Sequence, residues 1–346
     1  METKVIKIAG AGDAALEAAA KIIKNGGLVA FPTETVYGLG ANGLDERAAA
    51  GIYQAKGRPS DNPLILHICG IEMLSMIAAE VTDTAKKILA AFCPGPVTII
   101  LRRKEIVPLA ITGGLDTVGI RMPDNDIARE LIRRAGVPVA APSANVSGRP
   151  SPTTAAAVFN DLNGRIDMIL DGGACDFGVE STIVDCTGVV PTVLRPGTVT
   201  LEMLEEVLGS VQVDPALAGE NIVPKAPGMK YTHYAPKVPL TLLEGSPAKM
   251  SQGFQAEIAR LATAGKKTGV IVSREVSESL PEGIPVFVYG AQGDLEAIAA
   301  NLYEALRSFD EAAVDVLLAE GTGTAGLGLA IMNRLHKASG FRSIHV

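Results

Sequence analysis

A segment rich in proline and glycine, residues 209–237, separates two stretches of the chain that differ in hydrophobic pattern. The segment shows neither helical nor strand periodicity, which predicts a linker or a long ordered loop. The chain has 346 residues, more than one compact domain usually needs. We therefore predict one domain at residues 1–208, a linker or lid at 209–237, and a second domain at 238–346.

The stretch after this segment alternates strand-like and helix-like runs in regular order. Strands are predicted at residues 240–244, 267–273, 284–289, 314–320 and 342–346, with helices at 248–265, 294–309 and 326–338. Parallel strands need crossover connections, which are usually helices. The pattern therefore predicts a parallel, Rossmann-like α/β domain.

The stretch before the segment is less regular. Strands are predicted at residues 4–8, 28–31, 64–68, 97–101, 118–122, 137–142, 168–170, 182–186 and 192–196, and helices at 13–27, 45–57, 82–92 and 126–136. Several strands follow one another without an intervening helix, which a purely parallel sheet does not allow. This order predicts an α/β domain with a twisted, mixed sheet.

Composition excludes several classes of protein. The net charge is −7, aromatic residues make up 4% and Trp is absent, which argues against a surface built for nucleic acid. The four cysteines form no C-x-x-C pair and no H-E-x-x-H motif is present, so a protein-held zinc site is not expected. Without a signal peptide or a long apolar run, the chain is predicted to be cytoplasmic and not membrane-bound.

The run "KGRPSDNP" follows the predicted helix at 45–57. Lys56 and Arg58 suit a helix C-terminus for electrostatic reasons alone. That explanation leaves out the two prolines, which stiffen the run and fix where its polar side chains point. We therefore expect the two cations to face solvent and to bind the oxygens of a polyphosphate.

Other polar runs leave the ends of predicted strands. "PTETVYGLG" reads as a loop, and "APSANVSGRPSPT" is either a ligand-binding turn or a capped turn before a helix. Arg121 in "TVGIRMP" needs an anion, supplied by a ligand or by a structural salt bridge. His67 in "LILHI" is either a core histidine or a site residue near the basic turn.

The run "GTGTAG" at residues 321–326 matches a dinucleotide fingerprint between a strand and a helix. It lies in the last strand–helix unit, and no acidic residue follows to hold a ribose. A glycine-rich turn that lets the helix pack closely on its sheet is the better interpretation. A nicotinamide-dependent dehydrogenase, which depends on this run alone, is disfavoured.

Taken together, the motifs resemble the YrdC family of threonylcarbamoyl-AMP synthases. They are "FPTETVYGLG", "KGRPSDNPL", "PGPVT", "GIRMPD", "PSANVSGRPSPT", "GVESTIVD" and "LRPG", in the family's order. "APGMKYTHYAPK" and "GLGLAIMNRLHKAS" resemble the longer, two-domain version of the enzyme. The resemblance implies a YrdC-like domain with a concave site, followed by the Rossmann-like domain.

The resemblance also implies the substrates ATP, L-threonine and bicarbonate and the products threonylcarbamoyl-AMP and pyrophosphate. The implied catalytic residues are Lys56, Arg58, Ser143 and Asn145. The implied ATP contacts are Arg58, Asn62, Thr117, Ser143, Ser151, Arg195 and Tyr231. The implied threonine contacts are Thr35, His67, Arg121, Ser181 and Ala141, where some relatives have Thr at the last position.

Mg²⁺ is expected to arrive with ATP, with no protein metal site. The product is expected to feed the N6-threonylcarbamoyl modification of adenosine 37 in tRNA through downstream transferase proteins, and direct tRNA binding stays open. An RNA-binding accessory protein of the same fold is the alternative, disfavoured by the acidic charge. A hydrogenase-maturation carbamoyltransferase is disfavoured because its zinc-finger cysteines are absent.

Overall fold

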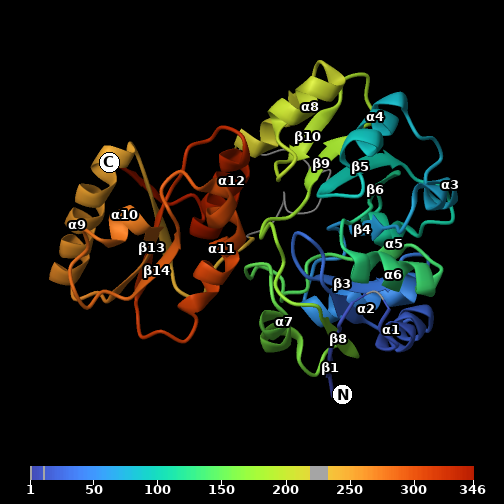
Figure 1. Cartoon of the computed structure of the whole chain (residues 1–346), viewed down its shortest axis with the longest axis horizontal. Coiled ribbons are helices and arrows are strands. Elements are labelled where there is room, and N and C mark those ends of the chain that lie inside the picture. Colours follow the sequence, from blue (N-terminus) through green and yellow to red (C-terminus); the bar gives the residue numbers. More distant parts are fainter. Residues whose placement is uncertain (1, 11, 219–232) are drawn as a thin grey trace. The chain divides into compact units, whose positions relative to one another are not determined.

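The structure is a computed structural model that describes residues 2–10, 12–218 and 233–346. It divides the chain into two compact units, Met1–Ser147 with Ser151–Lys230 and Gly148–Pro150 with Tyr231–Val346. They are called the first and the second unit below (Figure 1). Tyr231, which sequence predicts to contact ATP, lies outside the described residues, as do residues 219–232 of the predicted lid.

The first unit is built on a mixed sheet with the order β1-β8-β2-β3-β7-β4-β6-β5-β9-β10-β11 across the described residues. Its strands are β1 (Lys4–Lys7), β2 (Val29–Phe31), β3 (Gly38–Asn42), β4 (Ile65–His67), β5 (Val97–Arg102), β6 (Thr117–Arg121), β7 (Val139–Ala140), β8 (Met168–Asp171), β9 (Thr182–Asp185), β10 (Thr192–Arg195) and β11 (Gln212–Val213). Its helices are α1 (Ala15–Lys24), α2 (Glu46–Lys56), η1 (Ile71–Met73), α3 (Leu74–Ile77), α4 (Asp83–Phe92), α5 (Leu109–Thr112), α6 (Asp126–Ala135), α7 (Ala155–Leu162), α8 (Leu201–Leu208) and η2 (Pro215–Ala218). The predicted mixed sheet is confirmed.

Helix α2 begins and ends where its sequence predicts. Asp45 caps it by accepting hydrogen bonds from the backbone N–H groups of Arg47 and Ala48. Gly57 follows in the left-handed conformation, at a φ of 61°, which glycine adopts without steric cost. The turn at Gly57 ends the helix and starts the run "GRPSDNP".

Part of the predicted loop "PTETVYGLG" is instead a strand. Its second half begins β3, which pairs antiparallel with β2. A Cβ on Gly40 would lie 2.7 Å from a ring carbon of Phe31, so only glycine lets that ring lie against the strand. The sequence did not predict this strand because glycine is a weak strand former.

The two faces of the sheet pack differently around β4, β5 and β6. Leu64, Leu66, Ile99 and Leu101 belong to the main hydrophobic core. The alternate residues Ile65, Ile100, Ile183 and Leu194 form a separate small cluster. Because successive side chains of a strand point to opposite faces, this cluster lies on the other face of the sheet.

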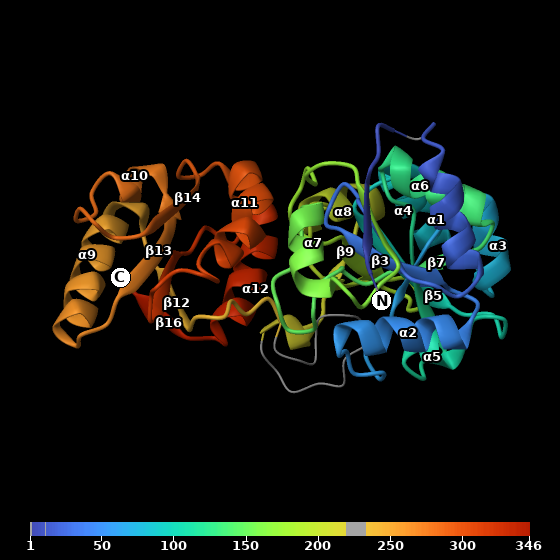
Figure 2. The same ribbon diagram turned by 90° about the horizontal axis from the view of Figure 1, so that it is seen from below.

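The second unit is a five-stranded parallel sheet with the order β14-β13-β15-β12-β16. Its strands are β12 (Leu240–Glu244), β13 (Thr268–Ser273), β14 (Val286–Gly290), β15 (Val316–Glu320) and β16 (Ser343–His345). Its helices are α9 (Pro247–Thr263), α10 (Arg274–Ser277), α11 (Leu295–Ser308) and α12 (Leu327–Ser339). In both views α9 and α10 lie on one face of the sheet and α11 and α12 on the other (Figures 1 and 2). The predicted Rossmann-like arrangement is confirmed, apart from the short helix α10, which sequence did not predict.

Candidate active site

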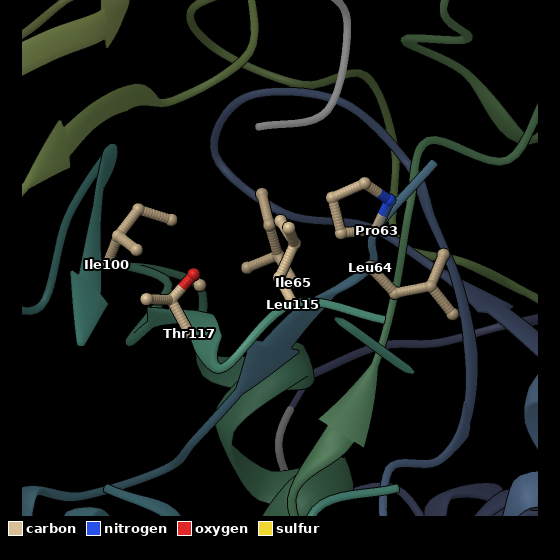
Figure 3. Close-up of a pocket in the computed structure, with 7 residues that line it drawn as sticks. Pro63, Leu64, Ile65, Ile100, Leu115 and Thr117 are labelled. Carbon is tan, nitrogen blue, oxygen red and sulfur yellow. The ribbon is translucent and has the colours of Figure 1, made fainter. Parts of the chain in front are cut away.

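The floor of the candidate site is apolar and lies on the second face of the first sheet. Ile65, Ile100 and Thr117 line a small pocket of about 10 Å³ there, together with Pro63 and Leu115 (Figure 3). In β6, Thr117 and Arg121 point to this same face because they are four positions apart and side chains two or four positions apart in a strand share a face. The buried cation Arg121 therefore lies on the same face of the sheet as this pocket.

Arg121 forms a buried ion pair with Glu34, which is the structural salt bridge that the sequence left open; only its partner was not predicted. Its Nη2 lies 2.9 Å from Oε1 of Glu34 and donates a hydrogen bond to Oγ1 of Thr35 at 2.8 Å. Arg121 and Glu34 are 5% and 2% exposed. Nε of Arg121 and both carboxylate oxygens of Glu34 nevertheless lack a hydrogen-bond partner among the described residues. Buried polar atoms are nearly always hydrogen-bonded, so Nε of Arg121 and Oε2 of Glu34, which the ion pair does not use, are available to a ligand.

His67 stands opposite Arg121 in the pairing of β4 with β6. Its ring is buried and meets the Phe31 ring edge to face. Burial, aided by the nearby Arg121 charge, lowers the pKa of His67 to about 3. His67 is therefore neutral near pH 7 and is too weak a base to hold a proton taken from a substrate amine.

This pKa predicts a specific loss of stability in acid. In the unfolded chain His67 has a pKa of 6.5 and is protonated below that pH. In the folded chain it stays neutral until about pH 3, so acid favours the unfolded state. Going from pH 7 to pH 5, we expect His67 to lower the free energy of unfolding by about 2 kcal/mol. Urea titrations at several pH values should show this slope in the native chain and a shallower one in His67→Gln. His345→Gln, which alters an exposed histidine, should keep the native slope. Equal slopes in all three proteins would contradict the prediction.

A second polar group adjoins the Arg121 pair. Oγ of Ser181 lies 2.8 Å from Oγ1 of Thr98, and Thr98 stands opposite Arg121 in the pairing of β5 with β6. Arg195 holds Ser181 by donating from Nε to its carbonyl oxygen at 3.0 Å and from Nη2 to its Oγ at 3.1 Å. Next to Ser181, Glu180 accepts a hydrogen bond from Ser151 at 2.5 Å. These contacts bring residues from distant motifs to one face of the sheet.

The expectation that Lys56 faces solvent is wrong. Lys56 is 1% exposed, and its Nζ donates to the carbonyl oxygens of Ser143 and Asn145. Oγ of Ser143 in turn donates to Oδ1 of Asn145 at 2.5 Å. Lys56 is the last residue of α2, and its side chain turns inward beneath the loop after β7. Its role here is to position that loop.

Arg58 is half-buried and stays beside the turn that carries it. It donates to the carbonyl oxygens of Asn62 at 3.3 Å and Pro63 at 3.0 Å. Asn62 is 4% exposed, and its Nδ2 has no hydrogen-bond partner among the described residues. The N–H of Ala141 donates to the carbonyl oxygen of Ile65 at 2.9 Å, so this amide is already used within the fold.

Two site residues escaped the sequence reasoning: Glu34 and Thr98. Glu34 is the acidic residue within "PTETVYG", directly after a buried strand, and that position was the available signal. Thr98 in "VTIIL" carries no signal beyond a hydroxyl inside an apolar strand. Both become evident only through their contacts with predicted residues.

Neither a metal centre nor a membrane span is evident in the described part of the chain. No group of three or more His, Cys, Asp or Glu side chains there is placed to hold an ion. No helix in the described ranges has both the length and the apolar character needed to cross a bilayer.

Comparison with known proteins covers both units. A family model described as "Telomere recombination" matches residues 21–197, and one described as "Threonylcarbamoyl-AMP synthase, C-terminal domain" matches residues 199–340. The threonylcarbamoyl-AMP synthase of Pyrococcus abyssi is 50% identical over 95% of each chain. That of Bacillus subtilis is 48% identical over 96% of this chain and 95% of its own.

Solved structures give the same result. The crystal structure of P. abyssi Sua5 complexed with L-threonine matches with a TM-score of 0.94 and 47% identity, covering all of both chains. E. coli YciO matches 56% of this chain with a TM-score of 0.51 and 25% identity. The resemblance inferred from the motifs is confirmed over both units. Because both family models match and relatives about half identical align over almost the whole length, this chain belongs to the two-domain threonylcarbamoyl-AMP synthase family.

Proposed function

We propose that this protein is an L-threonylcarbamoyladenylate synthase, a nucleotidyltransferase. It converts L-threonine, bicarbonate and ATP to threonylcarbamoyl-AMP and pyrophosphate. The relatives that bear this activity in their names support the proposal, as does the structural relative complexed with L-threonine. The observation that carries it is the buried Arg121–Glu34 pair, in which Nε of Arg121 and Oε2 of Glu34 have no hydrogen-bond partner among the described residues.

A free amino acid is a zwitterion, and this pair offers a partner to each of its charges. The guanidinium of Arg121 suits the two oxygens of the threonine carboxylate, because a fork matches a planar anion. Glu34 suits the ammonium group, which must later lose a proton before it attacks. Thr35, Ser181 and neutral His67 supply hydrogen-bonding groups for the threonine hydroxyl, and Ala141 contributes backbone.

ATP is proposed to bind along the rest of this face. The amide nitrogen of Asn62, which has no hydrogen-bond partner in the described part of the chain, suits a ring nitrogen or a hydroxyl of the nucleotide. Arg58 and Arg195 supply positive charge, while Thr117, Ser143 and Ser151 supply hydroxyl groups. Mg²⁺ would be held by the phosphates and would neutralise charge on the departing pyrophosphate. Tyr231 is also proposed to contact ATP, as the family motif implies.

The chemistry needs positioning more than a covalent intermediate. The amine of threonine adds to the carbon derived from bicarbonate and water leaves, which gives a carbamate. A carbamate oxygen then attacks the α-phosphorus of ATP, and the bond to pyrophosphate breaks. Lys56 orders the loop that carries Ser143 and Asn145, and Arg58 and Arg195 stabilise negative charge. No side chain is assigned to take the proton from the amine, because His67, with a pKa of about 3, is too weak a base to do so.

The product is proposed to serve N6-threonylcarbamoylation of tRNA adenosine 37 in the cytoplasm, through separate transferase proteins. An RNA-binding accessory protein is the rival. It predicts RNA affinity that persists without ATP and falls steeply with salt. The net charge of −7 disfavours it.

The direct test is pyrophosphate release from ATP. We expect release that requires both L-threonine and bicarbonate, together with a threonine-containing adenylate detected by mass spectrometry. Release that ignores threonine, or tight RNA binding without any release, would overturn the proposed function.

Substrate analogues test the amino-acid site separately. L-Serine lacks only the methyl group of threonine, so its kcat/KM should fall by about ten- to a hundredfold. L-2-Aminobutyrate lacks the hydroxyl and leaves a buried hydrogen-bonding group unpaired, so its kcat/KM should fall further. Equal kcat/KM values for the three amino acids would contradict a site built around the hydroxyl.

A further inference from the structure

The second unit has a cavity of its own. A space of about 450 Å³ lies at the carboxyl ends of β12, β13, β14 and β15, between the start of α9 and the start of α11. Cavities of this size hold small ligands. In open α/β sheets, ligands bind outside the carboxyl ends of the strands. The cavity therefore has both the place and the size of a binding site.

Glu320, the last residue of β15, is the charged group of this cavity. It is 3% exposed, Oε2 accepts from the backbone N–H of Ser273 at 2.6 Å, and Oε1 accepts from Nε2 of Gln292 at 3.3 Å. A carboxylate has about four lone-pair sites, so acceptor capacity remains on both oxygens. Burial raises the pKa of Glu320 above its ordinary value, a cost that hydrogen-bond donors from a ligand would offset.

The other walls restrict the ligand further. Pro247 and Met250 line the side of α9, and Leu295 and Ile298 line the side of α11. Among the described residues, no Lys, Arg or His lines the cavity. A phosphate would meet the Glu320 charge without a compensating cation, so anions are disfavoured. The walls suit a flat apolar ring system, and the carboxylate suits two neighbouring hydroxyl donors.

The run "GTGTAG" forms the rim beside Glu320. A Cβ on Gly328 would lie 2.0 Å from the carbonyl oxygen of Gly323, so the loop folds tightly back onto the start of α12. This agrees with the turn inferred from the sequence. A Cβ on Gly323, which lines the cavity, would have no atom within 4 Å. The glycines thus leave space beside the carboxylate, and no basic residue is there to make a phosphate cradle.

We propose that this cavity binds a nucleoside that carries no phosphate, with the ribose diol donating to Glu320 and the base lying between Met250 and Leu295. A nucleoside combines the two required features, a neutral planar ring and two adjacent hydroxyl groups. The site is built from the second unit alone and is independent of the function proposed for the first.

Adenosine is the probe, and the full chain is labelled with ¹³C at its methionine methyl groups. The Met250 resonance is identified by its loss in Met250→Leu. ATP is present throughout, so that nucleoside binding in the first unit does not interfere. We expect adenosine to shift the Met250 resonance at millimolar or lower concentration, and ATP alone to leave it in place. 2′-Deoxyadenosine, which has lost one hydroxyl, should bind about tenfold more weakly.

Two variants separate the carboxylate from the fold. Glu320→Gln should weaken adenosine binding about tenfold or more, whereas Glu282→Gln, at an exposed carboxylate, should leave it unchanged. Leu295→Trp fills the cavity and should abolish the shift even if Glu320→Gln fails to fold. The proposal is overturned if adenosine leaves Met250 unshifted, if ATP alone shifts it equally, or if neither cavity variant weakens binding.

Discussion

Replacing Arg121 by glutamine is expected to lower kcat/KM for L-threonine about a thousandfold, because charge-assisted hydrogen bonds worth about 4 kcal/mol are lost. The proposed fork on the threonine carboxylate disappears, and glutamine cannot replace its charge. The same change leaves Glu34 buried without its counter-ion. We therefore also expect the free energy of unfolding to fall by about 3–5 kcal/mol.

A double variant separates these two effects. Adding Glu34→Gln removes the stranded charge, so Arg121→Gln with Glu34→Gln should regain most of the stability and none of the activity. Threonine kinetics and urea denaturation of the native chain, the Arg121→Gln variant and the double variant measure both quantities. Arg129→Gln is the control, since Arg129 pairs at the surface with Asp126 and such pairs contribute little. If the double variant recovers threonine turnover, Arg121 is a structural residue and the proposed amino-acid site is wrong.

The second large effect concerns Lys56. In Lys56→Met, the carbonyl oxygens of Ser143 and Asn145 lose a buried donor, at about 1–3 kcal/mol for each unsatisfied group. We expect the free energy of unfolding to fall by about 3–5 kcal/mol in total, with pyrophosphate release lost because the loop is no longer positioned. Thermal melting and turnover at low temperature measure the two effects.

Lys86→Met is the matched control, because Lys86 is exposed and pairs with Asp83 within α4. It should change the free energy of unfolding by less than about 0.5 kcal/mol. An unchanged melting temperature in Lys56→Met together with lost activity would restore the original expectation that Lys56 acts on the phosphates of ATP. Unchanged melting and unchanged activity would remove it from the site altogether.

The sequence by itself determined most of the architecture. Apolar runs in alternation with amphipathic runs are local signals, and they predicted the parallel sheet of the second unit nearly strand by strand. The helix predicted at residues 45–57 corresponds to α2, which Asp45 and Gly57 cap. The ordered motifs identified the family and proposed most of the residues on the second face of the first sheet. Strand β3 escaped because its glycines depend on a ring from another strand.

Only the tertiary structure decided what the site residues do. Glu34 reaches Arg121, and Lys56 reaches Asn145, across long stretches of chain. Whether a charge is buried and what it contacts depends on the order and register of strands far apart in sequence, which no local pattern records. The cavity at Glu320 is likewise bounded by loops that follow four different strands. A sequence names the residue types available, but burial and pairing set their charge state and contacts, and those arise only when the sheet is assembled.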